Sequence, residues 1–429
     1  MKDTKLFSLI AVAAFLGWHT SAQIYDTNGD YVQTFAGYGE QGWVDGQGQL
    51  TKFSNPSQIV ADTSSNLYVW DSGNYLIRKI TPTATVSTLA GGGTDFEGNG
   101  TNVAFSYYSI GSMAIDHSNT IWLVAQYGNY YGSYCYFLNI GTNGYVTIQN
   151  GGPGLTNLST SSGICFDSAN NLYYSGGNII YRYNPSTGIP QPFAGNGTSG
   201  YQDGNGTVFP EFSYPGALAC DEANNIYVWD SGNYRIRRID QSQNITTIAG
   251  TGDAYSYPGS DGVGTNASFG GYDSPGISSM FSDNAGNVYF ACGSCIRMMN
   301  AQTNVVTMAG SFTQSGYANG AGNLAQFNGA SGACLSQGMI FVADSYNQRI
   351  RNITFNPQAQ VVSGANLSIG TYAGVKITGV VGRTYQIQSS PNMNTWNTVA
   401  TVLLTSSPYL WIDQNPVSGN KFYQAVLLP

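Results

Sequence analysis

Charged side chains are scarce in this 429-residue chain. Asp, Glu, Lys and Arg make up 9% of it, compared with about 25% in an ordinary soluble domain. Acidic residues outnumber basic ones by 23 to 15, for a formal charge of −8. This argues against nucleic acid as a partner, because that binding depends on clustered Lys and Arg. The two histidines leave little scope for His-based zinc sites or for proton relays of several histidines.

The chain also lacks an apolar run long enough to cross a membrane, since a spanning helix needs roughly 20 residues. Its apolar run at residues 6–18 is shorter. That run follows Lys2 and Lys5 and precedes small residues at 20–22, so residues 1–22 are predicted to be a secretory signal peptide. The mature protein is therefore expected to be secreted, periplasmic or at the cell surface, without a transmembrane segment.

Cysteine is present, but its six copies are too dispersed to build a disulfide framework. Three of them lie in short apolar runs and are predicted to be buried as small hydrophobic side chains: Cys165, Cys220 and Cys334. For the close pair Cys292 and Cys295 we predict a local disulfide across a tight hairpin. The remaining Cys135 is expected to be free.

What the sequence does contain is a repeat. One strand-like phrase occurs six times, at intervals of 51 to 62 residues, with an aromatic residue at its centre: Tyr68, Trp122, Tyr173, Tyr227, Tyr289 and Phe341. A polar turn opened by Asp precedes each of the first five copies, and a second turn and further β-rich runs follow the phrase. Four short strands in a period of about 50 residues are typical of a β-propeller blade.

The repeat is split between the two ends of this region. The sixth copy stops at residues 353–355, before its fourth strand, whereas residues 31–37 resemble a fourth strand that has no copy before it. The N-terminal strand is therefore predicted to complete the last blade, because a closed ring leaves no open sheet edge. The predicted fold is all-β, with a six-bladed propeller at residues 23–356. A linker at 357–364 and a small C-terminal β-sandwich at 365–429 complete the chain.

The best-preserved copy contains the phrases FSNP at residues 53–56, NLYV at 66–69 and DSGNY at 71–75. The fourth copy matches as closely, and so does the sixth at residues 344–351. In these phrases the chain resembles the NHL repeat over roughly residues 24–356. The second, third and fifth copies depart from the pattern in the Asp-Ser-Gly-Asn turn. The resemblance implies a six-bladed propeller and a broad range of functions: binding platforms, lectin-like modules and occasionally enzymes.

The C-terminal phrases at residues 385–390, 394–396 and 422–429 resemble a module on exported proteins of Verrucomicrobia and Planctomycetes, which points to a bacterial protein. At 65 residues, this segment is too small for a second ring and suits a compact β-sandwich.

Loop lengths predict where a ligand binds. The loops that join successive copies are long and the turns within each copy are mostly short, so one face of the ring should be elaborated. We call it the long-loop face; it also carries the turns after Asp71, Asp230 and Asp344. Five of its loops share an acidic or amide residue beside two glycines: residues 45–48, 97–100, 203–206, 261–264 and 319–322. Calcium is possible there, but the spacing differs from an EF-hand, and five-fold recurrence favours a structural turn. No other cofactor is expected.

Aromatic residues on the same face are candidates for ligand binding, since Tyr and Trp combine an apolar ring with a polar tip. The candidates are Trp43, Tyr107, Tyr130, Tyr201, Tyr257 and Tyr317. Tyr214 belongs to the same group. The alternative is an aromatic layer that packs on itself. Three carboxylates complete the candidate set: Asp71, Asp230 and Asp344. In the structural alternative, they cap their turns and pair with Arg78, Arg237 and Arg351.

No nucleophile elbow, phosphate-binding loop or His-Glu-x-x-His motif is present. We therefore predict an exported, non-catalytic binding protein whose long-loop face holds a glycan, peptide or protein. One alternative is a purely structural surface component. Another is an enzyme similar to six-bladed lactonases or lyases, a resemblance that implies an axial divalent metal held by several blades. The residues expected to end the second strands are Trp70, Val124, Ser175, Trp229, Ala291 and Ala343. They do not match such a ligand set, so no catalytic residue is assigned.

Overall fold

The structure is a computed structural model. It describes residues 30–355 except 130–131, 150–154, 156–157, 185–186, 257, 271–275 and 284, together with 374–377, 383–391, 394–404, 409–412 and 422–427. The predicted signal peptide and linker lie outside the described residues. The chain divides into two compact units, one containing the repeats and the other the C-terminal segment.

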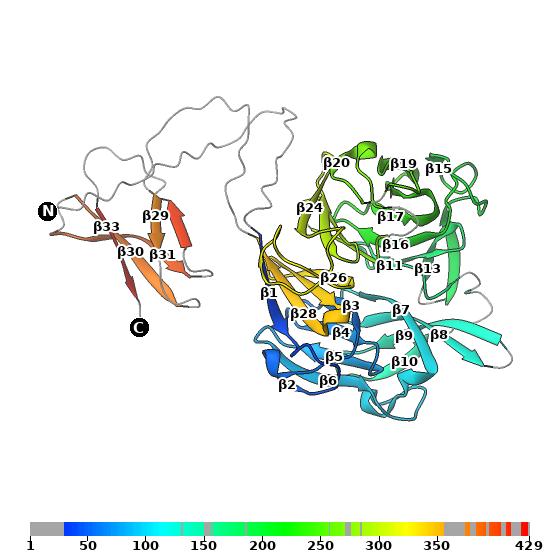
Figure 1. Cartoon of the computed structure of the whole chain (residues 1–429), viewed down its shortest axis with the longest axis horizontal. Coiled ribbons are helices and arrows are strands. Elements are labelled where there is room, and N and C mark those ends of the chain that lie inside the picture. Colours follow the sequence, from blue (N-terminus) through cyan, green and yellow to red (C-terminus); the bar gives the residue numbers. More distant parts are fainter. Residues whose placement is uncertain are drawn as a thin grey trace. The chain divides into compact units, whose positions relative to one another are not determined.

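Six antiparallel sheets form the first unit (Figure 1). Blade one contains β2 (Gly46–Gln47), β3 (Pro56–Ala61), β4 (Leu67–Asp71), β5 (Leu76–Ile80) and β6 (Thr85–Gly91). Blade two contains β7 (Tyr108–Ile115), β8 (Ile121–Asn129), β9 (Gly132–Ile140) and β10 (Val146–Gln149). Blade three contains β11 (Ile164–Phe166), β12 (Leu172–Gly176), β13 (Ile179–Asn184) and β14 (Ile189–Ala194).

The second half of the ring repeats this plan. Blade four contains β15 (Gly204–Asn205), β16 (Pro215–Cys220), β17 (Ile226–Asp230), β18 (Arg235–Ile239) and β19 (Asn244–Ala249). Blade five contains β20 (Gly262–Val263), β21 (Ser279–Ser282), β22 (Val288–Ala291), β23 (Cys295–Met299) and β24 (Asn304–Gly310). Blade six contains β1 (Tyr31–Ala36), β25 (Gly320–Ala321), β26 (Ala330–Ser336), β27 (Met339–Asp344) and β28 (Arg349–Thr354).

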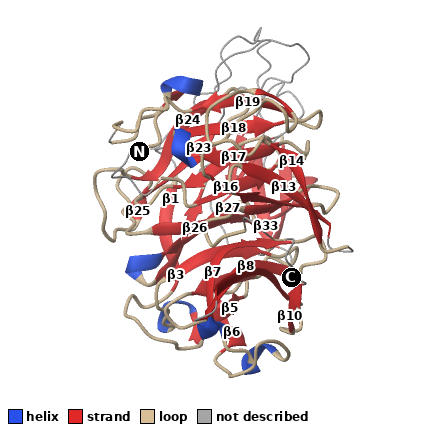
Figure 2. Cartoon of the chain, turned by 90° about the vertical axis from the view of Figure 1, so that its right-hand side faces the viewer, coloured by secondary structure: helices blue, strands red, loops and turns tan. Residues whose placement is uncertain are grey.

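The described helices are single 3₁₀ turns in the loops (Figure 2). They are η2 (Gly48–Leu50), η3 (Gly100–Asn102), η4 (Phe105–Tyr107), η5 (Ser231–Asn233), η6 (Gly264–Asn266) and η7 (Ser345–Asn347). Within the described part of the chain, no helix is long and apolar enough to span a bilayer.

The first strands of the six blades contact one another in a closed circle, in the order β3, β7, β11, β16, β21, β26 and back to β3. The apolar core lies between neighbouring blades. One cluster, for example, joins Trp70 and Ile77 of blade one to Leu123 and Leu138 of blade two. The six-bladed ring predicted from the repeat is confirmed.

The ring closes through the N-terminal strand, as the split repeat predicts. Strand β1 pairs antiparallel with β28, with Val32 opposite Ile353 and Thr34 opposite Arg351. The side chains of Val32 and Ala36 are fully buried. The last blade is therefore assembled from the two ends of the repeat region, which leaves no blade with an unpaired edge at the closure.

Four blades gain a fifth strand from the glycine-rich loop signature. The two-residue strands β2, β15, β20 and β25 each pair with the outermost strand of their blade. These short strands cover the edges that the blades would otherwise present to solvent. The signature is therefore a structural element of the propeller rim.

The C-terminal unit forms two small antiparallel sheets. One pairs β29 (Gly374–Ile377) with β32 (Tyr409–Ile412), and the other has the order β31 (Asn397–Leu403), β30 (Thr384–Ser390), β33 (Phe422–Leu427). Ile387 and Leu404 are fully buried within it. This segment is therefore all-β, as predicted.

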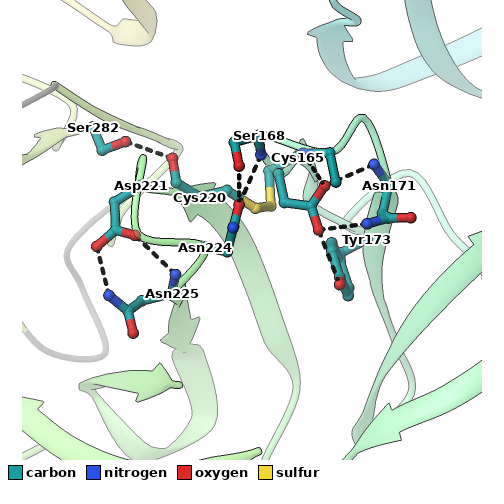
Figure 3. The surroundings of a disulfide bond; sticks show 11 residues. Cys165, Ser168, Asn171, Tyr173, Cys220, Asp221, Asn224, Asn225 and Ser282 are labelled. Carbon is teal, nitrogen blue, oxygen red and sulfur yellow. Dashed lines mark hydrogen bonds between the residues drawn. A yellow bond between two sulfur atoms is a disulfide. The ribbon is translucent and has the colours of Figure 1, made fainter. Parts of the chain in front are cut away.

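The cysteine prediction is wrong in two respects. Cys165 and Cys220 form a disulfide that joins β11 to β16, the first strands of blades three and four (Figure 3). Cys292 and Cys295 are free and buried; the Cys295 thiol donates to the Cys292 carbonyl at 3.8 Å. The disulfide arises because positions about one repeat apart meet where neighbouring blades adjoin. Cys135 and Cys334 are free, as expected.

Ring closure predicts a position-specific loss of stability along β1. Val32→Asp places a charge in a fully buried position within an apolar cluster and should lower the free energy of unfolding by about 3 kcal/mol or more. Gln33→Asp is the matched control, because the neighbouring side chain is exposed, and it should cost less than about 0.5 kcal/mol. Urea denaturation measures both, and equal effects would contradict closure through β1.

The disulfide should stabilise the ring, because it closes a loop of 55 residues. Replacing both Cys165 and Cys220 with Ala is expected to lower the free energy of unfolding by about 3–4 kcal/mol. Reductant should produce a similar loss in the wild type and no further loss in the double variant. Urea curves recorded with and without reductant test this, and a wild type indifferent to reductant would refute it.

Candidate functional site

The first strands of all six blades line a central channel. It encloses about 250 Å³. Its described lining is apolar apart from Gln58, Ser279 and Ser282, and it includes the disulfide. None of these lining residues is charged, so the channel offers neither an acid–base pair nor a set of anionic ligands.

The residues do not fit the axial metal that the enzyme alternative implies. Throughout the described ranges, no group of three or more His, Cys, Asp or Glu lies where it could hold a metal ion. The six positions considered for such ligands lie in the second strands, two residues after the central aromatic residue of each copy, and carry Trp, Val, Ser and Ala side chains. Trp, Val and Ala side chains offer no metal ligand, and a single serine hydroxyl does not replace a set of carboxylates or imidazoles.

The candidate carboxylates Asp71, Asp230 and Asp344 are fully buried. Each pairs with the arginine seven residues later: 3.0 Å from Asp71 to Arg78, and 2.8 and 2.7 Å for the other two pairs. Each also accepts a backbone hydrogen bond from the preceding loop. Burial raises the pKa of Asp71 to about 6, against the opposing effect of its hydrogen bonds and of Arg78. The structure thus places these carboxylates in the scaffold, where a ligand cannot reach them.

The same three arginines, together with Arg297 of blade five, bind the acidic or amide residue of the glycine-rich loops. Arg78 pairs with Asp45 at 2.5 Å, and Arg237 pairs with Asp203 at 2.7 Å. The remaining two pairs join Arg297 to Asp261 at 3.0 Å, and Arg351 to Asn319 at 2.7 Å. A buried arginine therefore explains the acidic or amide residue in four of the five loops, whereas Glu97 in the remaining loop accepts a hydrogen bond from the backbone of Ile148 at 3.4 Å. The structural interpretation of the signature is favoured over a calcium site.

Two candidate aromatic residues cover these arginines. The ring of Tyr201 lies 5.1 Å from the guanidinium of Arg237 and 4.1 Å from that of the neighbouring Arg235. The ring of Tyr317 lies 4.9 Å from the guanidinium of Arg351 and 3.9 Å from that of Arg349. Tyr107 stacks on Phe96, with ring centroids 5.2 Å apart. For these three residues, the alternative of an aromatic layer that packs on the protein itself describes the contacts best.

Other aromatic residues of the long-loop face remain open to solvent. Trp43 is 69% exposed, Tyr214 72% and Tyr346 68%. The candidates Tyr130 and Tyr257 lie outside the described residues. The described candidates therefore differ in degree: Tyr107, Tyr201 and Tyr317 stack on neighbouring side chains and are 43–47% exposed, whereas Trp43 and Tyr214 are more open.

A second cavity opens on the long-loop face between blades three and four. It encloses about 360 Å³ and is lined by residues 158–159, 161–162, 175–177, 214–216 and Ser231. None of the described lining residues is charged. The hydroxyl groups in the lining belong to Ser159, Ser161, Ser162, Ser175, Tyr214 and Ser231.

The serines tie the two walls of this cavity together. Ser175 accepts a hydrogen bond from the backbone of Gly163 at 2.8 Å and donates to the carbonyl of Gly216 at 2.9 Å. The hydroxyl of Ser231 donates to the carbonyl of Tyr214. The sequence analysis did not identify these serines as site residues. The one feature that could have indicated them is Ser175, because two other copies of the repeat carry Trp at the same position.

Comparison with known proteins shows the fold and leaves the function open. No family model matches the chain. Two structures from Bacteroides thetaiotaomicron, a protein of unknown function and an auxiliary nutrient binding protein, resemble it with TM-scores of 0.57 and 0.55. Their identities are 19% and 18%, over 76% of both chains in each case. The chain is also 25% identical to Protein SUPPRESSOR OF QUENCHING 1, chloroplastic, of Arabidopsis thaliana, over 74% of its own length but only 26% of that protein's.

The buried ion pairs predict a large cost for removing one partner. Asp230→Ala leaves Arg237 buried without its fully buried counter-ion, and should lower the free energy of unfolding by about 3–5 kcal/mol. Glu40→Ala is the control, because its pair with Lys52 is exposed, and should cost less than about 1 kcal/mol. Urea denaturation distinguishes the two. A similar small loss for both variants would show that the buried pair is dispensable.

Proposed function

We propose that this protein is an exported, non-catalytic binding protein of the NHL-propeller type, whose long-loop face holds a glycan, peptide or protein ligand. The cavity between blades three and four is the observation that carries the proposal. It combines about 360 Å³ of space with hydroxyl groups and an accessible aromatic ring on a rigid β scaffold. Small-molecule sites are commonly concave, largely preformed and of about 300–1,000 Å³.

An extracytoplasmic location accords with two features of the chain. Residues 1–22 have the charge and apolar pattern of a secretory signal. The Cys165–Cys220 disulfide belongs to the kind of bond that persists in oxidising compartments. The C-terminal unit is proposed to tether or orient the ring.

The fold neighbour described as an auxiliary nutrient binding protein is consistent with ligand capture as the task of such a ring. The enzyme alternative lacks comparable support, because the described residues bring together no set of metal ligands. The lining of the channel likewise contains no ionisable side chain that could act as a general acid or base at neutral pH.

The proposal predicts that binding depends on the long-loop face. The mature chain should bind members of a glycan or peptide array and release them chemically unchanged, with or without a chelator. The triple variant Trp43→Ala, Tyr214→Ala, Tyr346→Ala removes three accessible rings of that face and should weaken binding at least tenfold.

Tyr145→Ala is the matched control, since Tyr145 is 50% exposed in the turn between β9 and β10, on the opposite face. It should bind like the wild type. Three outcomes would overturn the proposal: no ligand on any array, chemical conversion of the ligand, or equal effects of the triple variant and the control.

A further inference from the structure

The cavity between blades three and four arises from one residue position. We call a junction residue the one that lies in the second strand of a blade, two positions after the central aromatic residue of the repeat, and faces the next blade. In blades one and four this residue is Trp, and its indole packs edge-on against a phenylalanine of the next blade. The ring centroids are 5.8 Å apart for Trp70 and Phe105 and 5.6 Å apart for Trp229 and Phe269.

Trp229 shows how much space the junction residue can fill. Its indole lies between Gly216 of its own blade and Gly276 of the next, 3.5 Å from where a Cβ atom would stand at either glycine. At the third junction the residue is Ser175. The cavity is lined there by Ser162 of blade three and by residues 214–216 at the start of blade four. It therefore occupies the space that an indole fills at the fourth junction.

At the other junctions with a small residue, neighbouring groups join the two blades. Val124 of blade two belongs to an apolar cluster with Leu155 and Leu158. At the fifth junction, the backbones of Gly293 and Ala330 form a β-bridge. At the sixth, the side chain of Gln348 bonds to the backbone amide and side chain of an asparagine, Asn55, in blade one. Ser175 instead leaves a cavity.

Tyr214 holds its ring at the rim of this cavity in a strained backbone conformation. Its φ of 50° is in the left-handed region, where the corresponding residues of blades one and six are Asn55 and Gly329. These two residue types tolerate that region, whereas others incur about 1–2 kcal/mol. The amide of Tyr214 donates to Asn178 at 3.2 Å, and its carbonyl accepts from Ser231.

The chemistry of the lining selects one ligand class. Serine hydroxyls both donate and accept hydrogen bonds, as sugar hydroxyls do. A tyrosine ring provides a flat apolar surface with a polar edge, which matches the apolar face of a pyranose. A charged ligand would find no counter-ion among the described lining residues. At about 30 Å³ per water-sized group, the volume of about 360 Å³ accommodates a ring of about a dozen non-hydrogen atoms.

We propose that this cavity binds a neutral sugar ring, which stacks on Tyr214 and bonds to the hydroxyls of Ser159, Ser161 and Ser231. The inference rests on the proposed function and names both its site and its ligand class.

The test uses saturation-transfer NMR and calorimetry with a panel of neutral mono- and disaccharides and the full mature chain. Ser175→Trp installs the residue that blades one and four carry at this position, so the fold should persist while the cavity is filled. Ser175→Trp and Tyr214→Ala should each weaken sugar binding at least tenfold. Tyr145→Ala, which alters an exposed ring on the opposite face, should bind like the wild type. Near-ultraviolet circular dichroism verifies the fold of each variant.

Three results would overturn the inference, and they separate it from the proposed function. Undiminished sugar binding by folded Ser175→Trp would place the sugar elsewhere. Binding of peptides or charged glycans alone, lost in the triple variant, would reject the ligand class but leave a long-loop binding protein. An unfolded Ser175→Trp variant leaves Tyr214→Ala to decide, and wild-type affinity of that variant would reject the site. Failure to bind anything on the arrays would reject the proposed function as well.

Discussion

The pairing of β1 with β28 is the interaction on which the rest of the structure depends. Every blade rests against two neighbours, and the apolar core lies between blades. The ring is therefore stable only if the first and last repeats meet. Because the final blade combines strands from both ends of the repeat region, closure couples the ends of that region through backbone hydrogen bonds. The disulfide adds a covalent link on the channel wall between blades three and four.

Buried arginines explain how a chain with few charges maintains long loops. Arg78, Arg237 and Arg351 each connect a carboxylate of their own blade to the incoming loop. In blade five, Cys292 takes the place of the carboxylate, and Arg297 keeps its link to Asp261. The scarce charges are therefore concentrated in the scaffold, and the cavity between blades three and four is lined by neutral hydroxyl groups.

Much of the fold was predictable from the sequence. The repeat fixes the number of blades, and its split between residues 31–37 and the sixth copy identifies the closing strand. The arginine partners of Asp71, Asp230 and Asp344 were also predictable, because residues seven apart across a short hairpin lie on adjacent strands. The Cys165–Cys220 bond was not, since it depends on how first strands of neighbouring blades align around the axis. The aromatic candidates were only partly predictable, because the stacking of Tyr201 and Tyr317 on arginines depends on how the long loops fold back onto their blades.

The cavity escapes sequence reasoning because it results from a side chain that is missing: Ser175 stands where blades one and four carry an indole. The most direct test of the account is a crystal structure of the mature protein grown with a neutral disaccharide. The account predicts a sugar ring stacked on Tyr214 between blades three and four. A sugar bound in the central channel or on another junction, with this cavity filled only by water, would contradict it.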